Sequence, residues 1–282
     1  STGTILIATG DGSKSSGDLT IRTANAATTG RSGALTFSSG TTLIGDSGSL
    51  SIGSGLATQG TGGSISITVG DGNSGTGGSI TMTAGKTRGT GLDGGDVSVI
   101  GGVGADNGGA VHIAGGQGAE FGGAVTIGSG AGTTTSSGAM TITTATSGKG
   151  ITGAMIFSSG IADSGASGDI TVGSGQATNG AAGDISIMVG ETTLASTAGA
   201  MLTMQAGDSV GATSTGGPVS ITAGDSTNEG GLVKLQSGTS TGQSTGTILI
   251  ATGDGSKSSG DLTIRTANAA TTGRSGALTF SS

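Results

Sequence analysis

Large apolar residues recur along this chain in a short pattern, G-x-Φ-x-Φ, in which Φ is Ile, Leu, Val, Met or Phe. Residues 63–70 read GSISITVG and residues 183–190 read GDISIMVG, and a polar segment follows each. Alternation with a period of two predicts a short β-strand, and the polar segment predicts a turn. We number each unit from its first residue, the pivot, as position zero. The pivots are Gly3, Gly17, Gly33, Gly48, Gly63, Gly78, Gly95, Gly109, Gly123, Gly138, Gly153, Gly168, Gly183, Ala200, Gly217 and Gly231, and the pattern restarts at Gly246.

The sixteen units are 14 to 17 residues long, and internal repeats of this size are typical of a solenoid. Positions zero, two, four and six share one face of a strand. Positions two and four are large and apolar, whereas position six is small or slim, so facing strands are expected to enclose a lens-shaped core. The expected core residues are Ile5, Ile7, Leu19, Ile21, Leu35, Phe37, Leu50, Ile52, Ile65, Ile67, Ile80, Met82, Val97, Val99, Val111, Ile113, Val125, Ile127, Met140, Ile142, Met155, Phe157, Ile170, Val172, Ile185, Ile187, Leu202, Met204, Val219, Ile221, Val233 and Leu235.

The number of units in each coil follows from the polar segments. If one unit closed a coil, its polar segment would supply the opposing strand, but that segment varies in length and keeps no register. Two units, or about 30 residues, are therefore expected in each coil. The pattern predicts an all-β fold, a two-sheeted parallel β-solenoid that forms an open-ended array. Disorder is the alternative for a chain with 65 glycines in 282 residues, and the regular apolar spacing argues against it.

Two longer periods underlie the short one. Residues 1–39 recur unchanged as residues 244–282, which indicates a window on a longer tandem array. The units that begin at Gly33, Gly48 and Gly63 resemble the units that begin 120 residues later. We therefore expect a single continuous array over 1–282. It contains eight-unit modules at 1–121 and 122–243, and the next phrase starts at 244–282.

The outward positions suggest two surfaces. If alternate units lie on opposite sheets, the sheet that begins at Gly3 carries outward aliphatic residues, and we expect this face to pack laterally against other copies. Position three is Thr or Ser in twelve units, which predicts hydroxyl ladders along both faces. The expected lateral face consists of Leu6, Ile100, Ile156 and Met188, and the hydroxyl ladder consists of Thr20, Thr36, Ser51, Ser66, Thr81, Ser98, Thr126, Thr141, Thr171, Ser186, Thr203 and Ser220.

Few residues suit catalysis or cofactor binding. The single histidine, His112, has no acid or nucleophile at a recurring offset, so we expect no enzymatic activity. With no cysteine and no carboxylate cluster, we expect no cofactor and no metal. An excess of 17 acidic over 10 basic residues argues against nucleic acid and anionic membrane surfaces as partners. No membrane span is evident. N-linked sequons are absent, so any glycan would be O-linked.

In composition and repeat pattern the whole chain resembles the very long Gly/Ser/Thr repeat proteins of microalgae and other protists, some of which build extracellular filaments. Thr81 with Thr83, and Thr141 with Thr143, also resemble the T-x-T pattern of ice-binding solenoids. The nine-residue calcium repeat that begins G-G-x-G-x-D does not recur in tandem, and only residues 101–106 (GGVGAD) match its first six positions. We expect a structural protein that forms the shaft of an extracellular filament and associates with its own copies end-to-end or laterally. The alternative is an adhesin stalk, or an ice- or carbohydrate-binding face.

Overall fold

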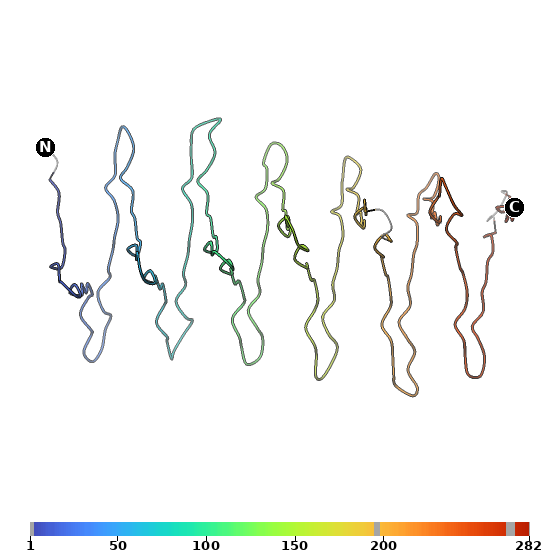
Figure 1. Cartoon of the computed structure of the whole chain (residues 1–282), viewed down its shortest axis with the longest axis horizontal. Coiled ribbons are helices and arrows are strands. Elements are labelled where there is room, and N and C mark those ends of the chain that lie inside the picture. The colour runs from blue at the N-terminus through green and yellow to red at the C-terminus, as the bar shows by residue number, and fades with distance from the viewer. Residues whose placement is uncertain (1–2, 195–197, 269–273, 282) are drawn as a thin grey trace. The chain divides into compact units, whose positions relative to one another are not determined.

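The computed structural model describes residues 3–194, 198–268 and 274–281. These residues contain no helix and no β-strand, and Figure 1 accordingly draws the chain as an open trace without coils or arrows. The expected two-sheeted parallel β-solenoid is therefore wrong. No hydrophobic side chain among the described residues is buried, so the lens-shaped core that the two sheets were to enclose is not formed. Residues 1–2, 269–273 and 282 of the repeated phrase lie outside the described part of the chain.

The physical reason lies in the backbone hydrogen bonds. A sheet requires ladders of N–H···O=C bonds between neighbouring strands. The described residues make eight backbone–backbone hydrogen bonds, whereas a folded domain makes about two such bonds for every three residues. None of the eight joins the middle of one apolar segment to the middle of another. The alternating segments thus lack the partner that would convert them into strands, and water satisfies their backbone groups.

Seven of the eight backbone hydrogen bonds have the same role. Each runs from the N–H of a pivot to the C=O at position seven of the preceding unit, with N···O distances of 2.8 to 3.0 Å. Each therefore closes the base of one polar turn, and the enclosed segments differ in length. The seven bonds are Gly95 to Gly85, Gly109 to Gly102, Gly123 to Gly116, Gly138 to Gly130, Gly217 to Gly207, Gly231 to Gly224 and Gly246 to Gly238.

The side chain at position six faces the next pivot across the same turn base. A methyl group placed on Gly63 would lie 3.4 Å from Cβ of Ser54, and one placed on Gly183 would lie 3.9 Å from Cβ of Ser174. These are contact distances, so positions six and zero converge at each turn. Contact at these distances leaves room for a small side chain, as the alanine pivot Ala200 illustrates, whereas a Cβ on Gly115 would overlap the backbone of Gly123, so glycine is required only at the narrowest turns.

Some turns depend on left-handed backbone. Gly75 and Gly91 lie in turns and have φ values of 82° and 75°, which residues with a Cβ adopt at a cost. By its internal contacts the chain divides into two units, Ser1–Ile142 and Thr143–Ser282. The turn-closing hydrogen bonds occur in both, so the same local structure recurs in each unit considered by itself.

Candidate functional site

The inward columns, which we define as positions two and four of every unit, are the largest apolar feature of the described chain. Ile65 at position two is 54% exposed and Ile67 at position four is 70% exposed, whereas outward Ile156 is 80% exposed. Position two is less exposed than position four in fourteen of the sixteen units. The inward side chains are thus partly covered, and they keep a large apolar surface in contact with water.

Coverage is greatest at the turn bases. Of the nine described residues of intermediate exposure, seven occupy position six: Thr23, Ala84, Gly101, Ala206, Ala223, Ser237 and Thr266. The convergence of positions six and zero explains this result, because each backbone shields the residue opposite. The least exposed residues therefore lie at the turn bases, and the side chains of the inward columns are more exposed.

The inward positions carry no charge. Across the sixteen units, positions zero, two, four and six contain no Asp, Glu, Lys, Arg or His, and the charged residues all lie at outward positions or in turns. Asp96 at position one, His112 at position three and Arg22 at position five illustrate the outward placement. The structure therefore presents one uncharged apolar side and one mixed polar side in each unit.

The expected lateral face is fully exposed. Leu6, Ile100, Ile156 and Met188 are all exposed, and they come from separate units that the described contacts do not bring together. All twelve members of the expected hydroxyl ladder are exposed as well. Among the hydrogen bonds of the described residues, none links two of these twelve hydroxyls.

A shallow hollow is lined by Arg22, Thr23, Ala24 and Asn25, and the equivalent residues Arg265 to Asn268 line a second one. Position seven is Ala24 here, where most units have glycine. The Thr23 hydroxyl donates a hydrogen bond to the carbonyl oxygen of Gly33 at 3.0 Å, so a side chain ties this turn instead of the backbone pair. The hollow thus lies beside a turn that is closed differently from the seven with a backbone pair.

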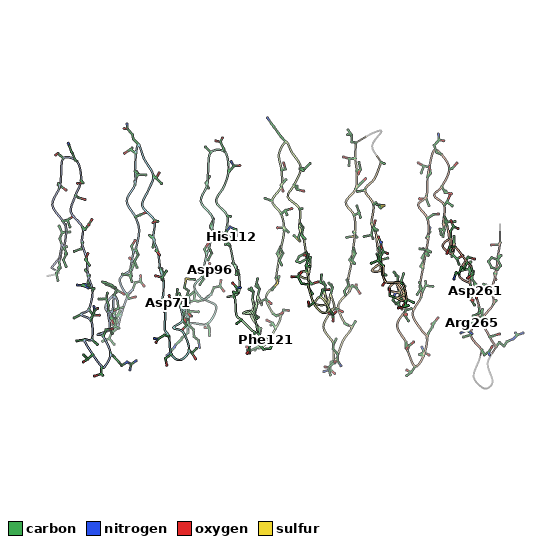
Figure 2. The ribbon with its side chains drawn as sticks, turned by 90° about the horizontal axis from the view of Figure 1, so that it is seen from below. Asp71, Asp96, His112, Phe121, Asp261 and Arg265 are labelled. Atoms are coloured by element: carbon green, nitrogen blue, oxygen red, sulfur yellow. The ribbon has the colours of Figure 1, made fainter. Side chains whose placement is uncertain are left out.

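Polar side chains are dispersed. Figure 2 shows labelled side chains such as Asp71, His112 and Arg265 projecting singly from the ribbon. Within the described ranges, no group of three or more His, Asp or Glu residues is arranged to hold a metal ion. Residues 3–194, 198–268 and 274–281 also include no helix with the length and hydropathy to traverse a bilayer.

The turn-closing hydrogen bond was not anticipated from the apolar pattern, although the sequence carries a signal for it. Position seven is glycine in fourteen of the sixteen units, and the exceptions are Ala24 and Ala145. Both exceptions follow a threonine at position six, Thr23 and Thr144. All seven backbone-closed turns have glycine at position seven and a glycine pivot, but the pair is only a partial signal, because turns such as Gly55 to Gly63 and Gly175 to Gly183 carry it without the bond.

Comparisons with family models, with curated proteins and with solved structures give no match to this chain.

Proposed function

We propose that this chain is a structural repeat protein that contributes to the shaft of an extracellular filament by associating with copies of itself. The observation that supports this proposal best is the recurrence of one turn closure along the chain. The same pivot-to-position-seven bond forms across segments whose ends are 7 to 10 residues apart, at 2.8 to 3.0 Å. A repeated local unit suits a function that depends on length and periodicity, because each unit adds the same contacts as the last.

The dispersal of polar side chains also supports a structural function over a catalytic one. Catalysis requires a nucleophile or base held against an orienting group. His112 makes no hydrogen bond among those of the described residues, and the two hollows are formed by a turn sequence rather than by convergent polar groups.

The exposed hydroxyl ladder supports a secondary proposal, that outward Thr and Ser residues accept O-linked glycans on the finished filament. Thr81, Thr126 and Thr141 are examples whose hydroxyls are open to solvent. The extracellular location is itself a proposal, based on a hydroxyl-rich and mildly acidic composition.

The proposal is tested by following purified full-length chain from dilute to concentrated solution. Analytical ultracentrifugation and negative-stain electron microscopy should show elongated assemblies above a threshold concentration. A chain that remains monomeric at every accessible concentration would refute the filament function. Binding to ice or to a carbohydrate without self-association would favour the adhesin or ice-binding alternative.

A further inference from the structure

We infer that the inward columns, and not the outward aliphatic residues, form the surface through which copies of this chain associate. This inference builds on the proposed filament function and identifies the interface that it requires. The occupant of the columns is a second copy of the same chain.

The amount of exposed surface shows how much area the described conformation leaves available to a partner. The chain has an accessible surface of 28005 Å². A compact monomer of 25.9 kDa would expose about 10,500 Å², and its fully unfolded chain about 37,600 Å². About 17,500 Å² is therefore open to water beyond what a compact chain of this mass exposes. The inward side chains are its most regularly spaced apolar part.

The inward columns are large enough for a stable interface. Burial of a large aliphatic side chain removes roughly 60 to 120 Å² of apolar surface from water. Since these side chains are already about one third to one half covered, two of them leave roughly 100 Å² in each unit. About eight units would then supply the roughly 800 Å² per partner of a stable protein interface. The ten repeats between Gly3 and Ile142, within one of the two contact-defined units, exceed that requirement by themselves.

Charge and shape favour a second copy of the chain as the partner. Because positions zero, two, four and six are uncharged in every unit, two inward sides can meet without burying an ion. The uncharged side of each unit carries large residues at positions two and four and small residues at positions zero and six. Two copies with the same spacing therefore match each other. The net charge of −7 over 282 residues adds only weak repulsion, and the charged groups remain outward or in turns.

The outward aliphatic residues satisfy these conditions less well. Leu6, Ile100, Ile156 and Met188 are one per unit and lie in units separated by intervening polar ones. They share their side with Thr, Ser and charged residues. A partner that covered them would also have to desolvate those polar groups. The two surfaces therefore make opposite predictions for matched substitutions.

The test uses full-length chain with two matched sets of four substitutions. The inward set is Ile65→Ser, Ile67→Ser, Ile80→Ser and Met82→Ser, and the outward control is Leu6→Ser, Ile100→Ser, Ile156→Ser and Met188→Ser. From the area left uncovered, each inward side chain contributes roughly a factor of five to the association constant. The inward set should raise the half-association concentration, measured by sedimentation equilibrium, at least about a hundredfold. The outward set should change it less than about threefold.

A crosslinking measurement guards against a general loss of local structure in the serine variants. The chain has no cysteine, so Ile67→Cys and Ile156→Cys each introduce a single thiol. A short bismaleimide should join two copies through Ile67→Cys and not through Ile156→Cys. Crosslinking only at Ile156→Cys, or an equal loss of association from both serine sets, would overturn the inference while leaving the filament function standing.

Two further outcomes separate the inference from the function on which it rests. Wild-type chain that stays monomeric would overturn both. Wild-type chain that stays monomeric but sediments with phosphatidylcholine vesicles, while the inward serine set does not sediment with them, would show that the inward columns bind lipid and would overturn the choice of a second copy as partner.

Discussion

Replacement of Gly115 by alanine tests whether the turn-closing hydrogen bond governs the local structure. Gly115 occupies position six before the turn that Gly123 closes, with a 2.8 Å bond from the Gly123 N–H to the Gly116 carbonyl. A Cβ on Gly115 would overlap the carbonyl oxygen of Gly123. In this narrow turn the two backbones touch, so the glycine is required by space.

The expected effect can be estimated from this geometry. To relieve the overlap, the turn base must open by roughly 1 Å, which stretches the bond beyond the roughly 3.5 Å at which a hydrogen bond ceases to count. A bond of this kind contributes about 1 kcal/mol, so protection of the Gly123 amide from hydrogen exchange should fall about fivefold. Proton–deuterium exchange by NMR on the dilute chain measures this value directly.

The control is Gly128→Ala, at an outward position where an added methyl meets nothing within 4 Å. It should leave exchange at Gly123 unchanged. The competing outcome is that the bond survives with alanine at position six. The turn closed by Gly231 provides an example, because it has Ala223 at position six and still keeps a 2.9 Å bond. If Gly115→Ala leaves protection at Gly123 intact, the turn has adopted that alternative path and steric closure is not what limits it.

Three other perturbations follow from the same contacts. Insertion of Gly-Ser after Thr134 should leave Gly138 amide exchange within twofold of wild type, because wider turns elsewhere are closed by the same bond; complete loss of protection would contradict this. Thr23→Val should remove the 3.0 Å bond to Gly33 and shift the Gly33 carbonyl resonance in NMR, whereas Thr23→Ser should retain it. Ile67→Asp should leave the turn amides of the dilute chain unchanged, because its side chain is 70% exposed; a spreading loss of protection would indicate a buried core instead.

The alternation of apolar and polar residues was informative about local geometry and misleading about the fold. The exposure of Ile65, which is lower than that of Ile156, agrees with an inward and an outward side, whereas in the first unit inward Ile5 is more exposed than outward Leu6. It does not supply a neighbouring strand. A period of two describes how side chains lie about one segment, whereas a β-sheet depends on which other segment its backbone meets.

The chemistry of the surface could also be predicted only in part from the sequence. The absence of charge from positions zero, two, four and six can be read from the sequence alone. The sequence does not reveal that the Thr23 hydroxyl, rather than a backbone pair, closes the turn at Ala24. That hydrogen bond depends on the path of the chain between Thr23 and Gly33.

The sequence by itself therefore determined the repeat, the position of each turn, the uncharged inward side and the scarcity of catalytic groups, because these depend on residue identity and spacing along one segment. Only the three-dimensional structure decided that the segments remain unpaired, that Gly123 and its equivalents close the turns, and that the inward columns stay open to water. Those properties depend on contacts between residues distant along the chain, and an alternating pattern leaves such contacts undetermined.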